Sequence, residues 1–147
     1  MKKLILIFFI LVFTVCNVSA VVTIGKSFTN YVRAYIEDAG ANKYKLCISF
    51  MATFKSLPDS PFLQLKMMDD TTIELRGEKT SSKEQQWQSS TYYNEEACFI
   101  LTQEQFDQIA KGVKKLRLNA QPEYYEKKWK NGEIGKKLYK DYNKSKF

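Results

Sequence analysis

A strict alternation of apolar and polar side chains over residues 44–54 constrains the fold of this chain more than any other feature. One set of alternate residues is apolar: Tyr44, Leu46, Ile48, Phe50, Ala52 and Phe54. The set between them is mostly polar: Lys45, Cys47, Ser49, Met51 and Thr53. A period of two predicts a β-strand with one buried face, because successive side chains of a strand point to opposite sides of the sheet. Such strands are typical of an antiparallel sheet that is covered on one side.

Similar alternation predicts the other strands of this sheet. They cover residues 28–37, 62–68, 72–77, 93–101 and 113–118. Turn-forming residues at 38–42 join the first two strands as a hairpin, and Asp69-Asp70-Thr71 makes a tight turn in a second hairpin. Two prolines, Pro58 and Pro61, interrupt the pattern between the hairpins. We expect a polar surface loop over 78–90 and a mobile lead-in over 21–27.

Two helices complete the predicted secondary structure. Thr102 and Gln105 have the spacing of a capping box, and Gly112 is suited to end the short helix that follows. Pro122 suits the first turn of a C-terminal helix over 122–145, which Asn131-Gly132 kinks or divides in two. The predicted fold class is α+β: a single antiparallel sheet of five to six strands, with one short helix and the C-terminal helix packed on it.

The first twenty residues have the layout of a secretory signal peptide. Lys2 and Lys3 precede an apolar run over 4–15, and Val18-Ser19-Ala20 offers small residues for cleavage after Ala20. Residues 21–147 then form a single domain, which is long enough to bury a core. We therefore expect an exported protein, either periplasmic or secreted. Cys16 follows bulky residues, which favours a soluble product over a lipid-anchored one.

The positive charge of the chain is concentrated at its C-terminal end. The net charge is +7, and residues 121–147 contribute eight lysines against Glu123, Glu126, Glu133 and Asp141. This composition is typical of a solvated helix face. Nucleic acid is not an expected partner, because the protein is exported and the tail has no arginine for bidentate contacts. Membrane contact is not expected either, because Gly132 interrupts the apolar stripe that lying on a lipid surface requires.

Two cysteines remain beyond the predicted signal peptide, Cys47 and Cys98. By strand parity both lie on the polar side of the sheet, and an oxidising compartment would allow them to pair. A disulfide requires their strands to be neighbours. If the strands are apart, the two thiols pack separately as small apolar groups.

The sequence contains no arrangement typical of an active site. There is no histidine, so the commonest general base and the commonest metal ligand are both missing. Asp69-Asp70 is explained by its turn, and Glu95-Glu96 are strand neighbours that point to opposite faces. We expect no catalytic residues, no metal site, no cofactor and no enzymatic activity.

The polar side of the predicted sheet also carries aromatic residues that could bind a partner. These are Tyr31, Tyr35, Phe62 and Tyr92. Tyrosine provides a large contact area at low entropic cost, so an open face of this kind suits a protein, peptide or glycan. The interpretation that we favour is that the C-terminal segment, with Tyr125, Trp129, Leu138 and Tyr142, covers this face, because large exposed apolar patches are rare on soluble monomers; the open face is the alternative.

Two stretches of the chain resemble a known group of proteins. Residues 62–75 have the pattern of an apolar strand, an acidic turn and a second apolar strand. Residues 98–118 have the pattern of a strand, a capped helix, a glycine and a basic strand. Together they are similar to small exported proteins of unknown function from gut-dwelling Gram-negative anaerobic bacteria, although Asp70-Thr71 stand where those proteins have a turn glycine. The resemblance implies an exported α+β fold and no particular activity.

The sequence as a whole predicts an exported, non-catalytic binding protein or envelope-associated accessory protein. Its ligand and its oligomeric state are left open. The alternative is a hydrolase or a hydrolase inhibitor that acts outside the cytoplasm. A deep pocket with converging carboxylates would favour the enzyme, and a flat face bearing tyrosines would favour binding.

Overall fold

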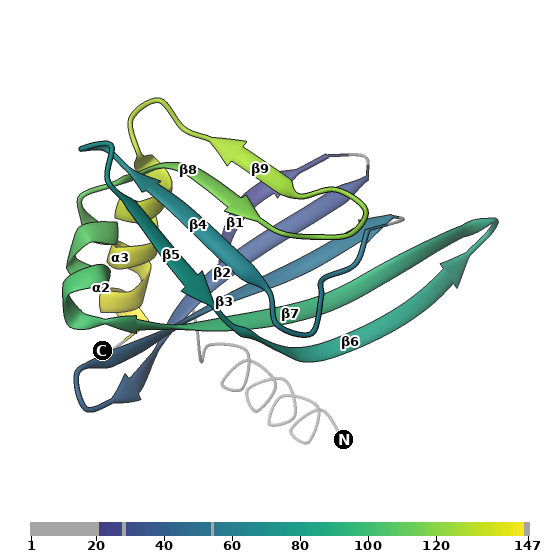
Figure 1. Cartoon of the computed structure of the whole chain (residues 1–147), viewed down its shortest axis with the longest axis horizontal. Coiled ribbons are helices and arrows are strands. Elements are labelled where there is room, and N and C mark those ends of the chain that lie inside the picture. The colour runs from purple at the N-terminus through teal and green to yellow at the C-terminus, as the bar shows by residue number, and fades with distance from the viewer. Residues whose placement is uncertain (1–20, 28, 54, 146–147) are drawn as a thin grey trace, which may run out of the picture.

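The computed structural model describes residues 21–27, 29–53 and 55–145, and the predicted signal peptide with Cys16 lies outside these residues. Within them the chain is mostly β-structure with two helices, as Figure 1 shows, and an α+β fold is confirmed in this broad sense. No helix among the described residues is both long and apolar enough to cross a membrane.

The larger sheet has five strands in the order β1-β2-β3-β7-β6, and all neighbours are antiparallel. The strands are β1 (Val22–Lys26), β2 (Asn30–Gly40), β3 (Lys43–Thr53), β6 (Glu78–Trp87) and β7 (Ser90–Thr102). The predicted hairpin of β2 and β3 is confirmed, with Ala34 opposite Ile48. The β6–β7 hairpin extends beyond the rest of the molecule at the right of Figure 1.

The prediction of a single sheet is wrong, because four strands form a second sheet in the order β5-β4-β8-β9. They are β4 (Phe62–Met67), β5 (Thr72–Arg76), β8 (Val113–Leu118) and β9 (Tyr125–Lys128). The chain passes from β5 to β6, and so from one sheet to the other, through Gly77. A Cβ atom at Gly77 would lie 2.6 Å from a ring carbon of Phe99, so only glycine allows the two sheets to approach at this corner.

The apolar faces of the two sheets and the helices share one core. The larger sheet contributes Val32, Ile48, Phe50 and Phe99, among others, and the second sheet contributes Leu63, Leu65, Leu116 and Leu118. These are the alternate residues that the sequence pattern assigned to the buried side. The alternation therefore identified the buried side chains, although it did not indicate that two sheets divide them.

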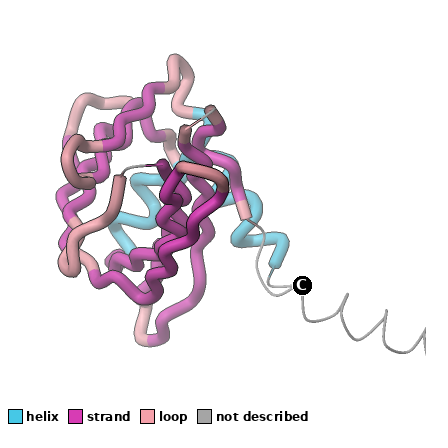
Figure 2. Tube along the Cα trace, turned by 90° about the vertical axis from the view of Figure 1, so that its right-hand side faces the viewer, coloured by secondary structure: helices cyan, strands magenta, loops and turns pink. Residues whose placement is uncertain are grey.

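The helices α2 (Gln103–Ala110) and α3 (Glu133–Ser145) pack against each other at one end of the sheets. They lie at the left of Figure 1, and Figure 2, which looks along the long axis, shows them beyond the two groups of strands. The predicted capping box is present: Gln105 N donates to Thr102 Oγ1, and the Gln105 side chain accepts from Thr102 N. Phe106 of α2 stacks on Tyr44 at 4.0 Å between ring centroids and joins the helices to β3.

Three other sequence predictions need correction. Residues 78–90 are not a loop, because β6 pairs along its length with β7. Residues 21–27 contain β1, with Val22 and Ile24 buried in the core. The predicted helix over 122–145 begins only at Glu133, because residues 125–128 form β9 and pair with β8.

Candidate functional site

The outer side of the five-stranded sheet carries the residues that the sequence singled out for binding. Three of the four predicted aromatic residues, Tyr31, Tyr35 and Tyr92, lie on this side with half-exposed side chains. Arg33 and Met51 lie between them, and Tyr31 is directly opposite Met51. We call this surface the tyrosine face; it comprises Tyr31, Arg33, Tyr35, Met51, Tyr92, Glu96 and the Cys47–Cys98 pair.

The fourth predicted residue, Phe62, lies elsewhere. It is the first residue of β4 in the second sheet, where Leu63 and Leu65 point into the core and Phe62 points outward. The guanidinium of Arg76 covers its ring at 5.0 Å from the centroid. Parity alone placed Phe62 with the tyrosines, since it cannot show that a strand belongs to a different sheet.

The C-terminal segment does not cover the tyrosine face. Tyr125, Leu138 and Tyr142 belong to the core on the opposite side of the larger sheet, and Trp129 packs against that same core. The half-exposed tyrosines therefore remain open to solvent among the parts of the chain that the structure describes.

A disulfide joins the central strand of the larger sheet, β3, to its neighbour β7. Cys47 of β3 is directly opposite Cys98 of β7, with 4.1 Å between their Cα atoms, and the sulfurs are bonded. The two cysteines thus lie on the same side of the sheet and on neighbouring strands, as a disulfide requires. Of the two alternatives for Cys47 and Cys98, the disulfide is confirmed and separate thiols are not. Cys47 is buried, whereas Cys98 is half-exposed on the tyrosine face.

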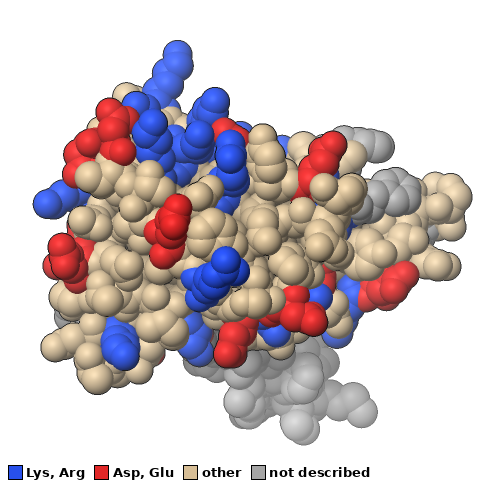
Figure 3. All heavy atoms as spheres, in the orientation of Figure 1, with Lys and Arg blue, Asp and Glu red and all other residues tan. Residues whose placement is uncertain are grey.

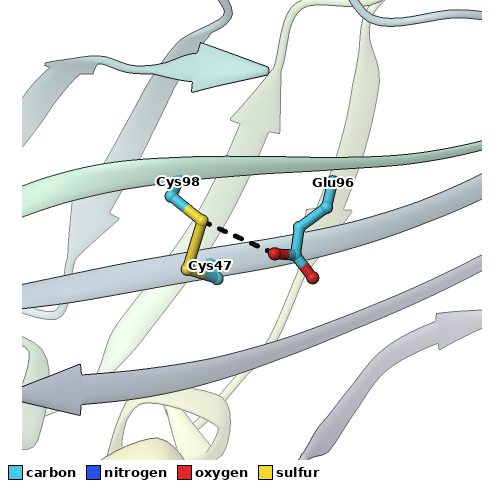
Figure 4. Close-up of side chains that lie close together, drawn as sticks. All are labelled: Cys47, Glu96 and Cys98. Atoms are coloured by element: carbon cyan, nitrogen blue, oxygen red, sulfur yellow. Dashed lines mark hydrogen bonds between the residues drawn. A yellow bond between two sulfur atoms is a disulfide. The ribbon is translucent and has the colours of Figure 1, made fainter. Parts of the chain in front are cut away.

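Glu96 lies beside this disulfide and organises the polar groups around it. Figure 4 shows its carboxylate turned toward the sulfurs, with Oε1 3.7 Å from Cys98 Sγ. A disulfide sulfur has no proton, so this is a contact rather than a hydrogen bond while the bond is intact. The same oxygen accepts hydrogen bonds from the hydroxyls of Tyr35 at 3.1 Å and Thr80 at 3.3 Å. Burial and the nearby Glu96 charge raise the pKa of Tyr35 to about 12, so Tyr35 is a neutral donor at ordinary pH.

The ligand atoms of Cys47, Glu96 and Cys98 lie within 4.8 Å of one another. Metal ions are bound by thiolates, and the disulfide leaves neither sulfur as a thiolate. In its oxidised form this group therefore acts as part of a surface and not as a metal centre.

Tyr31 lies between two cations at the other end of the tyrosine face. Arg33 is 5.1 Å and Lys26 is 5.8 Å from the centroid of its ring. Cations over an aromatic ring at such distances are attracted by its negative face. These contacts favour one position of the Tyr31 ring on the sheet.

Glu95 points away from the tyrosine face, as the parity of Glu95-Glu96 predicted. Its carboxylate is fully buried and accepts from Leu57 N at 2.7 Å and Ser82 Oγ at 2.9 Å. Lys79 Nζ lies 3.0 Å from it and also donates to the carbonyl of Leu57. The hydrogen bond to Glu95 raises the pKa of Lys79, so the cation is retained. This pair fixes the connection between β3 and β4 and is structural.

Asp69 and Asp70 form the turn that the sequence predicted. Asp69 Oδ1 accepts from the backbone and the hydroxyl of Thr71, and Asp70 has a left-handed φ of 67°. The hydrogen bond and charge of Lys114 lower the pKa of Asp70, so it is ionised and paired.

A second surface, which sequence reasoning missed, lies on the outer side of the four-stranded sheet. It is a hollow of about 530 Å³ that we call the lysine groove, lined by Lys66, Lys114, Lys115, Lys128, Trp129 and Lys130. Figure 3 shows Lys and Arg side chains gathered on this side of the molecule. The signal in the sequence was the dense lysine content near 114–115, in a predicted strand, and near 127–130, which was assigned to the C-terminal helix rather than to a neighbouring strand.

Comparison with known proteins gives no relative for this chain: no family model matches it, and no curated protein or solved structure is significantly similar.

Proposed function

We propose that this chain is an exported, non-catalytic binding protein, and that its tyrosine face docks onto a partner protein. The observation that carries the proposal is the composition of this face. Tyrosine, methionine and arginine are the residue types enriched at protein interfaces, and Tyr31, Tyr35, Met51 and Arg33 lie together on an open sheet. Sites for small ligands are concave instead, so a sheet face of this kind favours a protein partner.

The contacts within the tyrosine face also favour binding. Arg33 and Lys26 fix the ring of Tyr31, and Glu96 fixes the hydroxyl of Tyr35. The disulfide joins β3, which pairs with the strand that carries both tyrosines, to β7. Side chains that are already ordered lose less conformational entropy when a partner binds, so more of the contact energy appears as affinity.

Site-directed photo-crosslinking tests the docking proposal. A photoreactive residue replaces Met51 at the centre of the face, and the matched control carries it at Gln64, on the outer side of the second sheet. In cells that make the protein, we expect one discrete adduct from position 51 and none from position 64. The double substitution Tyr31→Ala and Tyr92→Ala should remove the adduct. Equal adducts at both positions, or none at position 51, would contradict the proposal.

Export is tested separately. Signal-peptide cleavage after Ala20 predicts that the protein recovered from the periplasm or the medium begins at Val21, which N-terminal mass analysis detects. An intact N-terminus on a protein found only in the cytoplasm would contradict export. It would not contradict docking by the tyrosine face, which the crosslinking experiment tests independently. If the captured partner is a hydrolase, its activity with and without the bound protein distinguishes inhibition from simple attachment.

A further inference from the structure

The lysine groove presents more positive charge than its own carboxylates neutralise. Lys66, Lys115 and Lys128 stand directly opposite one another on β4, β8 and β9. Like charges in such a cross-strand row destabilise a sheet. Negative charge that lies near the row offsets this repulsion.

Two carboxylates lie close to these ammonium groups. Asp70 Oδ1 is 3.1 Å from Lys114 Nζ and 3.7 Å from Lys66 Nζ. Glu126 Oε1 is 3.6 Å from Lys115 Nζ and 3.7 Å from Lys128 Nζ.

Glu126 is shared further, because its other oxygen is 3.0 Å from Arg117. Lys130 has no carboxylate within 4.0 Å among the described residues. Four lysines and one arginine thus share two carboxylates, the fifth lysine has none, and the hollow attracts an anion.

The walls of the groove are apolar in spite of its charge. Trp129 is partly buried against the core, and its backbone N donates to Lys114 O at 2.8 Å, which holds the main chain at Trp129 beside β8. Lysine side chains present aliphatic stems below their ammonium groups. A ligand that fills the groove must therefore combine negative charges with C–H-rich surfaces, one of which packs on an indole ring.

The spacing of the lysines suits a ligand with repeated charges. Neighbouring strands lie roughly 4.8 Å apart, so the row from Lys66 to Lys128 spans roughly 10 Å. A hollow of about 530 Å³ is in the size range of small-ligand sites. A short acidic oligosaccharide has this combination of length, charge and C–H surface. Each of its sugar rings, or every second ring, bears a carboxylate or a sulfate.

We propose that the lysine groove binds an acidic oligosaccharide, with its anionic groups on Lys66, Lys115 and Lys128 and one sugar ring on Trp129. Nucleic acid is less suitable, because base stacking uses successive aromatic residues and the groove has a single indole. A lipid surface is less suitable, because a hollow admits separate anionic groups and not a flat layer. This site lies on a different sheet from the tyrosine face, so the two proposals stand independently.

Tryptophan fluorescence provides a direct binding assay. The chain has two tryptophans, and the substitution Trp87→Phe leaves Trp129 as the single reporter. The probes are a hexamer of galacturonic acid, a heparin-derived hexasaccharide, neutral maltohexaose, phosphatidylglycerol vesicles and a single-stranded DNA oligomer. We expect one or both acidic sugars to change the fluorescence saturably, with weaker binding as salt rises, and no change with maltohexaose.

Single substitutions then locate the site. Lys115→Gln and Lys128→Gln should each lower the affinity about fivefold, which corresponds to about 1 kcal/mol for one ammonium–anion contact. Lys83→Gln on β6 of the other sheet removes the same charge and should leave the affinity unchanged. Isothermal calorimetry of Trp129→Ala, after circular dichroism confirms its fold, should show at least a tenfold loss.

Four results would overturn the proposal. The first is that neither acidic sugar binds, and the second is that all three lysine variants weaken binding equally. The third is that maltohexaose binds as strongly as the acidic sugars, and the fourth is that only the vesicles or the DNA bind.

Discussion

Reduction of the Cys47–Cys98 disulfide is expected to lower the free energy of unfolding by about 4 kcal/mol. The bond closes a loop with a sequence separation of 51, and the chain-entropy relation converts a loop of that length into this stabilisation. Reduction is a cleaner perturbation than substitution. Cys47 is only 1% exposed, so replacing its side chain would add a packing loss to the loss of the cross-link.

The assay is urea unfolding of the oxidised and the reduced chain, followed by circular dichroism. The substitution Cys16→Ser leaves Cys47 and Cys98 as the only cysteines. With a denaturant slope of about 2 kcal/mol/M, the midpoint should fall by about 2 M urea on reduction. The variant with Cys47→Ala and Cys98→Ala controls for effects of the reductant itself. Adding reductant should not change the urea midpoint of this variant.

The reasoning is refuted if oxidised and reduced chains unfold within about 0.5 M urea of each other, since the slope then gives about 1 kcal/mol. The disulfide itself is checked by mass, because reduction and alkylation must add two alkyl groups that the unreduced chain does not accept.

Three other perturbations have definite outcomes. Lys79→Met should cost about 3 kcal/mol in urea unfolding, because it leaves the buried Glu95 carboxylate unpaired; adding Glu95→Gln should recover at least half of that loss. Thr102→Ala removes the cap of α2 and should cost about 1 kcal/mol in the same measurement, and no loss would mean that the capping box does not stabilise the helix. The pKa of Tyr35 is raised in the folded chain, so its contribution to stability is present below pH 10 and lost between pH 10 and about 12. An ultraviolet pH titration should therefore show a late ionisation of Tyr35 that Glu96→Gln moves to lower pH; burial alone raises the pKa of Tyr125, so its late ionisation should not move.

Much of the secondary structure, and the side of the sheet on which the two cysteines lie, followed from local patterns. Alternation assigned Ile48 and Phe50 to the core and Cys47 to the other side, because each strand buries one face only. The same parity separated Glu95 from Glu96. Thr102 and Gln105 located the start of α2 to the residue, since a cap depends on side chains adjacent in sequence.

What the patterns could not provide was the pairing of strands that no predicted hairpin turn connects. The division into two sheets depends on the bend at Gly77. A glycine between two predicted strands does not indicate whether the chain stays in the same sheet or crosses to another. The strand β6 has no apolar alternation to reveal it, because its residues from 80 to 86 are exposed on both sides. Tyr125 and Trp129 are four residues apart, a helical spacing, and that coincidence concealed β9.

The lysine groove was missed for the same reason. Lys66, Lys115 and Lys128 are far apart in sequence and meet only when β8 pairs with both β4 and β9. A count of charge along the chain identified an excess of lysine near the C-terminus but could not bring Lys66 to it.

The disulfide determines what happens to the chain when a protease cuts it. The loop that it closes contains β4, β5 and β6, together with the turn at Gln88 and Ser89 at the tip of the projecting hairpin. Such exposed tips are where proteases cut first. A single cut anywhere between Cys47 and Cys98 would yield two fragments that stay covalently joined, so the nicked protein keeps all of its parts and the ladder between β3 and β7 can hold them in register.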